Sequence, residues 1–173
     1  MKTAASLFGI LLVLVIAPVA VAQASPANTG QAQMPEPGAA TAAVDVAAGA
    51  QAAVAVVDTF GKALAAADFE QVEAMLDPAV IILESGGAER SRSEYLVHHA
   101  KSDAAFLAGS HSALSQRTAR IDGDTVWVAS ESEVHASKDG KPMTVLSTET
   151  MVLKKSSGGW KIVHIHWSSR PKQ

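Results

Sequence analysis

Apolar residues recur at intervals of three and four between residues 46 and 64. They are Val46, Ala50, Ala53, Val54, Val57, Phe60 and Leu64. This spacing places their side chains on one face of an α-helix, so the pattern predicts a long amphipathic first helix. A short second helix is predicted to begin at Asp68, because Asp68 is a favoured N-cap residue and Gln71 follows three positions later. Pro78 ends it.

The next apolar run, residues 79–84, has no polar position before Glu84. A strand that is apolar on both faces is typical of a strand covered on both sides, so Glu84 is expected at the edge of a buried region. Ser91 and Glu94 then form a second capping box, which predicts a helix over residues 92–108. Gly109 follows at its end.

The remainder of the chain has the pattern of strands joined by tight turns. Residues 111–121, 125–136, 143–154 and 160–168 are rich in β-branched and alternating apolar residues. Asp-Gly and Gly-Gly pairs separate these runs and are strong hairpin signals. The sequence therefore predicts an antiparallel meander.

The order of these elements predicts an α+β fold, in which three N-terminal helices pack on a curved antiparallel sheet. The amphipathic first helix needs an apolar surface to cover. The concave side of the meander is the only large one that the pattern offers. Packing the helix there leaves a cone with a pocket.

The last strand carries the densest chemistry. Because side chains alternate along a strand, Trp160, Ile162, His164 and His166 are expected to share one face. We expect this face to point inward, toward Glu84 and the helix that bears His99. Imidazoles titrate near neutral pH and also bind metals.

Three interpretations of His164 and His166 stay open. They could be structural residues with internal hydrogen bonds, acid–base or ligand-contacting groups acting with Glu84, or metal ligands. A metal would take a third ligand from the following candidates: Glu84, His99, Glu131 and Glu149.

Three further residues complete the predicted pocket. Glu149 lies among apolar neighbours, which would raise its pKa and suit general acid or base work. The alternative is a buried pair of Glu149 with Arg170 or His164. Tyr95 and His99 share one side of the third predicted helix. The expected ligand-binding residues are thus Glu84, Tyr95, His99, Glu149, His164 and His166.

Composition excludes several classes of protein. The 173 residues include no cysteine and carry a formal net charge of −3. Lys154-Lys155 is the densest basic cluster, which argues against a nucleic-acid partner. The sequence contains no Gly-x-Ser-x-Gly, phosphate-binding loop, dinucleotide fingerprint or His-Glu-x-x-His motif. No cofactor is expected.

The first residues predict export from the cytoplasm. An apolar run at residues 7–16 follows Lys2, and small residues at 20–24 suit signal peptidase. We therefore expect a signal peptide over 1–24, a flexible linker over 25–46 and one domain over 47–170. The apolar run is too short for a stable membrane anchor. The mature protein is expected to be periplasmic or secreted.

The ending Trp160-Lys161-Ile162-Val163-His164-Ile165-His166-Trp167-Ser168, after this helix order, resembles the nuclear transport factor 2-like (NTF2-like) superfamily. More narrowly, the chain is similar to secreted bacterial SnoaL-like and DUF4440 domains over about residues 47–170. Glu84-Ser85-Gly86-Gly87 and Tyr95-x-x-His98-His99 also match. The resemblance implies a cone-shaped α+β fold with a pocket, often dimeric through the outer face of the sheet.

The resemblance does not select a reaction, because this superfamily includes ketosteroid isomerase, scytalone dehydratase, polyketide cyclases, epoxide hydrolases and inactive binding domains. No position matches the catalytic Asp or Asp/His pair of its enzymes. We expect a secreted domain that binds a small, partly apolar molecule and forms a homodimer. The alternatives are a metal-free isomerase or dehydratase, a metal-binding protein and a non-catalytic dimerisation module.

Overall fold

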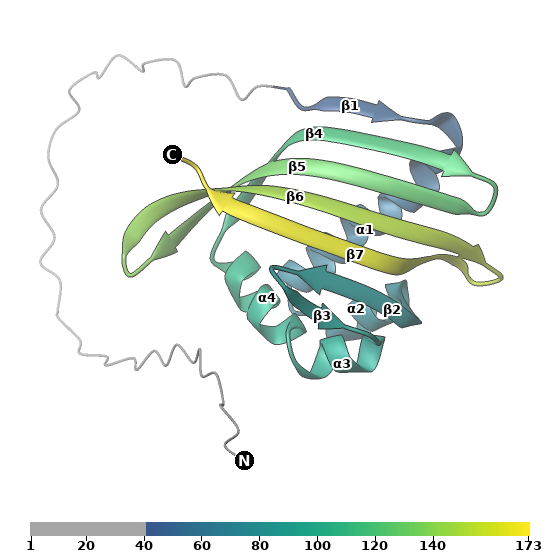
Figure 1. Cartoon of the computed structure of the whole chain (residues 1–173), viewed down its shortest axis with the longest axis horizontal. Coiled ribbons are helices and arrows are strands. Elements are labelled where there is room, and N and C mark those ends of the chain that lie inside the picture. Colours follow the sequence, from purple (N-terminus) through teal and green to yellow (C-terminus); the bar gives the residue numbers. More distant parts are fainter. Residues whose placement is uncertain (1–40) are drawn as a thin grey trace, which may run out of the picture. The chain divides into compact units, whose positions relative to one another are not determined.

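The structure is a computed structural model that describes residues 41–173 (Figure 1). The signal peptide expected at 1–24 and most of the expected linker lie outside the described residues. The described chain forms one seven-stranded sheet with the strand order β1-β4-β5-β6-β7-β2-β3. Its helices are α1 (Gln51–Ala65), α2 (Phe69–Met75), α3 (Arg92–Val97) and α4 (Ala100–Ala108), with a 3₁₀ turn at Ala48–Ala50. Its strands are β1 (Ala43–Val46), β2 (Leu76–Glu84), β3 (Gly87–Glu89), β4 (His111–Asp122), β5 (Thr125–Lys138), β6 (Lys141–Ser156) and β7 (Gly159–Pro171).

The predicted meander is confirmed. Strands β4 to β7 pair in sequence order and antiparallel. The β5–β6 turn places Asp139 at φ 53° and Gly140 at φ 73°, as expected for a two-residue Asp-Gly hairpin. Strand β2 joins β7 in parallel, and β3 folds back on β2. The α+β fold with a curved sheet is therefore as the sequence predicts.

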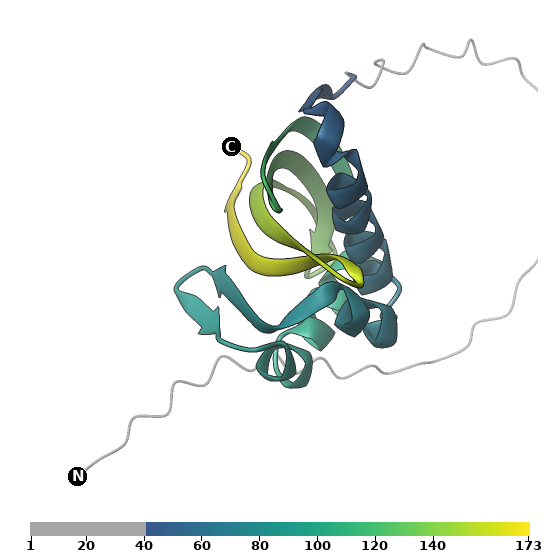
Figure 2. The same ribbon diagram turned by 90° about the vertical axis from the view of Figure 1, so that its right-hand side faces the viewer.

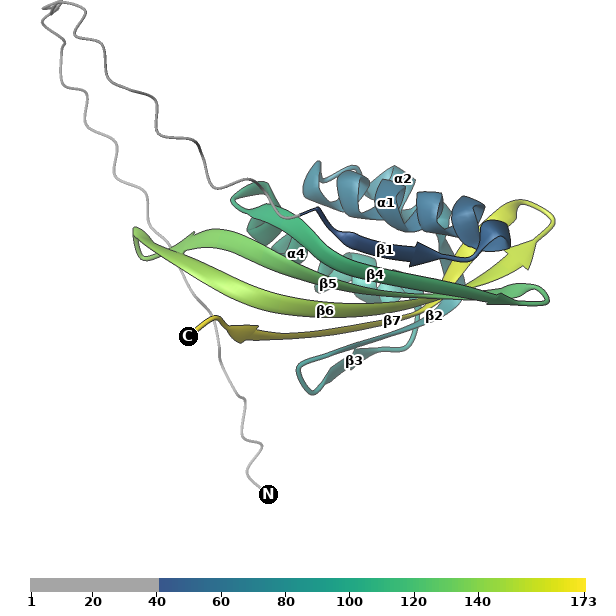
Figure 3. The same ribbon diagram turned by 90° about the horizontal axis from the view of Figure 1, so that it is seen from above.

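Helix α1 covers the concave side of the curled sheet (Figure 2). Its apolar stripe buries Ala53, Val57, Phe60 and Leu64, as its spacing predicts. These side chains belong to one core cluster with Met151, Leu153, Ile162 and Ile165 of the last two strands. Seen from above, α1 and α2 lie together on one side of the sheet (Figure 3). No helix among residues 41–173 has the length and apolar content that crossing a bilayer requires.

Both predicted helix caps are present. Asp68 Oδ1 accepts a hydrogen bond from the backbone N of Gln71 at 3.1 Å. Ser91 Oγ accepts one from the backbone N of Glu94, also at 3.1 Å. The helix predicted over 92–108 is nevertheless two helices, because the chain bends at residues 98–99, between α3 and α4.

Two stretches differ from the expected pattern. Residues 43–46, expected at the end of the linker, form β1, which pairs in parallel with β4. An ion pair between Asp45 and Arg120 fastens this strand to its neighbour. Strand β2 is covered on one face only, since Ile81 and Leu83 remain 45% and 38% exposed. The outer face of the sheet is thus uncovered at β2.

The prediction that Trp160, Ile162, His164 and His166 share an inward face of β7 is wrong beyond residue 162. Leu153 pairs with Ile162, but the preceding residue Val152 pairs with His164, so Val163 is an extra, bulged residue. A one-residue bulge shifts the alternation of side chains along a strand. Ile162 and Ile165 are consequently both buried. His164 and His166 point to the outer face.

Candidate functional site

The concave face of the sheet and two helices enclose a pocket of about 760 Å³. Its apolar walls include Val57, Phe60 and Leu64 of α1 and Phe106 and Leu107 of α4. Ligand pockets in proteins are typically of this size and are lined by apolar side chains with a few polar groups. The pocket can therefore accommodate a small organic molecule.

A row of five residues crosses the pocket wall from β4 to β2. Register pairs Arg117 with Ser130, Ser130 with Glu149, and Glu149 with Trp167. Trp167 in turn pairs with Glu84. All five residues line the pocket, and we call them the polar row. Because neighbouring strands lie about 4.8 Å apart, the side chains of the row lie next to one another. In order they supply a guanidinium, a hydroxyl, a carboxyl, an indole ring and a second carboxyl.

Glu149 is the largely buried carboxyl of this row. Its Oε2 atom accepts a hydrogen bond from Trp167 Nε1 at 2.9 Å. Its other oxygen has no hydrogen-bond partner within residues 41–173, where no fully buried polar side-chain atom is left unsatisfied. That oxygen is therefore accessible from the pocket. Burial raises the pKa of Glu149, which shifts its equilibrium toward the neutral carboxyl, a group that can donate a hydrogen bond.

Arg117 is held by two partners. Its Nη1 atom lies 2.6 Å from Asp58 Oδ1 on α1, and its Nε donates to Ser130 Oγ at 3.1 Å. The Arg117 side chain is 13% exposed and that of Asp58 is 48% exposed. The charge of this arginine is therefore balanced by Asp58.

Beyond Trp167, Glu84 lies in an acidic corner built by β2, β3, α3 and α4. Burial raises the pKa of Glu84, and the nearby charge of Asp103 raises it further. Asp103 is fixed by Tyr95, whose hydroxyl donates to Asp103 Oδ2 at 2.9 Å. His99 of this corner contacts the buried Glu89 through Nδ1. Glu84 itself has no hydrogen bond or ion pair within the described residues, so its carboxylate is free to accept a proton.

The predicted site residues separate into two groups. Glu84 and Glu149 line the pocket. Tyr95 is fully buried behind it and orients Asp103. His99 does not line the pocket. Glu149 is bonded to Trp167, whereas the sequence suggested Arg170 or His164 as its partner.

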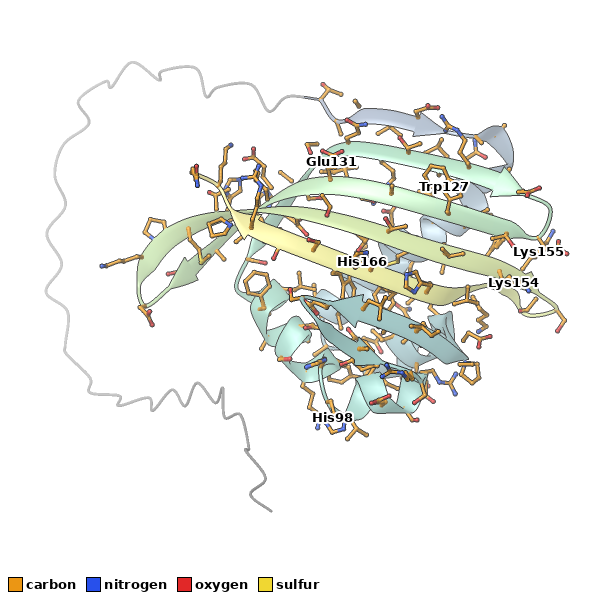
Figure 4. All side chains as sticks on the ribbon, in the orientation of Figure 1. His98, Trp127, Glu131, Lys154, Lys155 and His166 are labelled. Atoms are coloured by element: carbon orange, nitrogen blue, oxygen red, sulfur yellow. The ribbon has the colours of Figure 1, made fainter. Side chains whose placement is uncertain are left out.

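His164 and His166 lie outside the pocket. His164 Nδ1 is 2.9 Å from the carbonyl oxygen of Ile81, and His166 is exposed. Figure 4 shows His166 with Trp127 and Glu131 on the face of the sheet that is turned away from α1. These histidines therefore cannot meet Glu149 in the pocket. Among residues 41–173, no group of three or more His, Cys, Asp or Glu side chains could hold a metal ion.

Sequence reasoning missed Asp58, Arg117, Ser130, Asp103 and Trp167 as members of the pocket. A signal for Asp58 was present, because it follows Val57 on a helix whose apolar stripe faces the sheet. Arg117 and Ser130 could be placed only with the β4–β5 register, which shifts between Leu114 and Gln116. Trp167 was assigned to the wrong face because the bulge was not foreseen.

Comparison with known proteins identifies the family. The model of the SnoaL-like domain matches residues 53–171. A candidate ketosteroid isomerase from Shewanella frigidimarina is 37% identical, with a TM-score of 0.65, and the match covers 68% of this chain and 94% of that one. The CaMKII hub of S. rosetta is 27% identical, with a TM-score of 0.64, and the match covers 72% of this chain and 98% of the hub.

A nuclear transport factor 2-like superfamily protein from Salmonella enterica shares the fold at 18% identity and a TM-score of 0.61, and the match covers 71% of this chain and 92% of that one. A comparison with curated proteins found no match. The narrower DUF4440 assignment stays a prediction. The family model spans more than half of the chain, so the chain belongs to the SnoaL-like domain family of the nuclear transport factor 2-like superfamily.

Proposed function

We propose that the pocket binds a small, partly apolar molecule that carries a carbonyl or similar hydrogen-bond acceptor. The observation that carries this proposal is Glu149, whose carboxyl is anchored by Trp167, keeps one oxygen open to the pocket and has a pKa that burial raises. A buried donor with no protein acceptor favours a ligand that supplies one. The apolar walls from α1 and α4 would hold the rest of the molecule.

Binding can be tested with 2-acetylnaphthalene, a compact aromatic ketone. The chain has three tryptophans, so the double substitution Trp127→Phe and Trp160→Phe leaves Trp167 as the only one. We expect the ketone to quench Trp167 fluorescence. Glu149→Leu should weaken binding about tenfold, or ~1.4 kcal/mol, because the donor is lost.

Glu149→Gln is the matched variant, since its amide can still donate a hydrogen bond, and it should retain most of the affinity. Glu131→Gln changes a carboxylate on the outer face and should have no effect. Equal affinity of the Leu and Gln variants for the ketone would contradict the assigned contact.

A second candidate function is metal-free proton transfer, as in an isomerase or dehydratase. Glu84 and Glu149 flank Trp167 in the polar row, so their Cα atoms are about 10 Å apart across two strand spacings. Glu84 could take a proton from a carbon next to the ligand carbonyl while Glu149 donates a hydrogen bond to the carbonyl oxygen. Glu84 would then return the proton to another carbon. The 37% identity to a candidate ketosteroid isomerase supports this possibility.

The reaction can be measured with a β,γ-unsaturated cyclic ketone, which gains ultraviolet absorbance when its double bond moves into conjugation. We expect Glu84→Gln to abolish turnover and to leave binding of the ketone within about threefold, since the base is lost and the pocket is kept. Turnover by the Gln variant at the wild-type rate would exclude Glu84 as the base.

We also propose that the domain forms a homodimer through the outer face of its sheet. Trp127, Ile81 and Leu83 are 42%, 45% and 38% exposed on this face. Exposed apolar patches of this kind mark interaction surfaces. The 27% identity to a hub domain supports assembly. We also propose that the protein acts in the periplasm or outside the cell.

A further inference from the structure

A chain of polar contacts joins α1 to the polar row. Asp58 holds Arg117 Nη1 at 2.6 Å, and Arg117 Nε donates to the buried Ser130 at 3.1 Å. Ser130 pairs across the sheet with Glu149. Arg117 forms its one ion pair within residues 41–173 with Asp58, and none with Glu149. The guanidinium nearest the buried carboxyl is thus already neutralised.

Few other charges face Glu149. The pocket lining contributes Lys62 and Asp58 from α1, Arg117 from β4, Glu84 from β2 and Asp103 from α4. Lys62 is exposed, so Arg117 is the cation whose charge would favour the ionised form of Glu149. Burial raises the pKa of Glu149 most strongly, the hydrogen bond from Trp167 lowers it, and smaller effects come from Arg117, which lowers it, and Asp58, which raises it. A change in the balance between Arg117 and Asp58 would therefore shift the proton affinity that burial and Trp167 set for Glu149.

We propose that Asp58 determines the specificity of the pocket: by neutralising Arg117 it keeps Glu149 a neutral hydrogen-bond donor, so that the pocket accepts a carbonyl compound and rejects a carboxylate. The choice of ligand class rests on the proposed function. An unpaired guanidinium would instead offer its fork to a carboxylate, which arginine binds in bidentate fashion. Asp58 occupies that position, 48% exposed on the α1 side of the pocket.

The effect on Glu149 can be measured without any ligand. Carboxyl carbons labelled with ¹³C are titrated by NMR, and the Glu149 signal is assigned by its loss in Glu149→Gln. In Asp58→Asn we expect the midpoint of Glu149 to fall by about one pH unit, a tenfold loss of proton affinity. Asp58→Glu retains the charge and should preserve the midpoint. Glu70→Gln removes an exposed carboxylate of α2 and should not change it.

A double-mutant cycle tests the route through Arg117. If Asp58 acts through this guanidinium, Asp58→Asn should shift the midpoint less than half as far in an Arg117→Gln background, as an order-of-magnitude expectation for coupled groups. An unchanged midpoint in Asp58→Asn, or an equal shift in both backgrounds, would overturn the proposal.

Specificity is tested with a matched pair of probes, 2-acetylnaphthalene and 2-naphthoate. The comparison uses a Glu149→Gln background, in which Glu149 cannot ionise and capture the freed Arg117. There, Asp58→Asn should strengthen 2-naphthoate binding about tenfold and change ketone binding less than about threefold. An unchanged preference would refute the specificity role.

The two proposals fail in different ways. If neither probe binds any variant, the proposed ligand class is wrong and the specificity role falls with it. The NMR titration still decides whether Asp58 controls the proton of Glu149.

Discussion

Glu149 combines two properties that rarely occur together in a protein interior. It is a largely buried carboxyl group, and within residues 41–173 its one hydrogen-bond donor is the indole of Trp167. The ring of Trp167 is itself held between Phe60 and Tyr95, with centroids 6.5 and 6.3 Å away. A group fixed in this way keeps its orientation toward the pocket.

The protonation of Glu149 should appear in the stability of the fold. Burial raises its pKa above the usual 4.5, so its stabilising contribution is complete below that pH and is lost as pH rises through the folded-state value. We expect Glu149→Gln to gain stability relative to wild type as pH increases above the usual pKa of 4.5. Urea titrations at several pH values measure this. A difference that stays constant with pH would contradict the raised pKa.

The two histidines of β7 are predicted to contribute to stability and not to ligand binding. His164→Ala and His166→Ala should each leave binding of 2-acetylnaphthalene unchanged, because both side chains lie on the outer face of the sheet. His164→Ala should cost about 0.5–1 kcal/mol of unfolding free energy through its lost bond to Ile81, and His166→Ala less. Calorimetry and urea unfolding check both values. A binding defect in either variant would return these residues to the site.

The pocket residues that could be predicted from the sequence are those that differ from their immediate neighbours in the chain. Glu84 ends an apolar strand and Glu149 interrupts one, so each stands out by its neighbours alone. Arg117 and Ser130 are ordinary residues of polar strand faces, and they gain meaning only when the β4–β5 register brings them together. Register shifts depend on contacts between strands, which no single stretch of sequence displays.

At the scale of elements, the helices and the meander were predictable because spacing, caps and turn residues agreed. The bend between α3 and α4 was not, since residues 92–108 carry no glycine or proline to mark it. The bend is stabilised by tertiary contacts: the Tyr95–Asp103 hydrogen bond joins the two helices, and the His99–Glu89 pair joins α4 to β3.

Removing the Tyr95 hydroxyl tests this corner. Tyr95→Phe should lower the free energy of unfolding by about 1–3 kcal/mol, because the substitution removes the buried hydroxyl and leaves Asp103 without its hydrogen-bond donor. Urea unfolding measures the loss. Ser93→Ala, on the exposed side of the same helix, is the matched control and should change stability by less than about 0.5 kcal/mol. Equal effects of the two substitutions would exclude a structural role for the Tyr95 hydroxyl.

At the scale of the described domain, the sheet has two different faces. The concave face is covered by α1 and forms the pocket, while the outer face presents Trp127, Ile81 and Leu83 without cover from residues 41–173. The sequence suggested a strand buried on both sides at residues 79–84. A second subunit on the outer face would satisfy that pattern.

Self-association is therefore expected to depend on Trp127. Trp127→Glu places a charge in the middle of the outer face and should convert a dimer to a monomer without loss of the fold. Sedimentation velocity gives the assembly state, and circular dichroism reports the fold. Lys154→Glu, beside the β6–β7 turn, is the control. A wild-type protein that sediments as a monomer would exclude this interface.

The bulge at Val163 decides which side chains of β7 reach the pocket, so strand pairing as well as residue identity sets the chemistry there. Deletion of Val163 would remove the extra residue and leave Ile165 and Trp167 inward and His164 and His166 outward, because the residues on both sides of the bulge already alternate in step with β6. Regular pairing of the full-length strand without a bulge would instead turn His164 and His166 inward and Trp167 outward, which exchanges an indole that supports a carboxyl for a pair of imidazoles. A strand shorter by this one residue would thus present the same reactive groups to the pocket, whereas one of equal length that pairs without a bulge would present different ones.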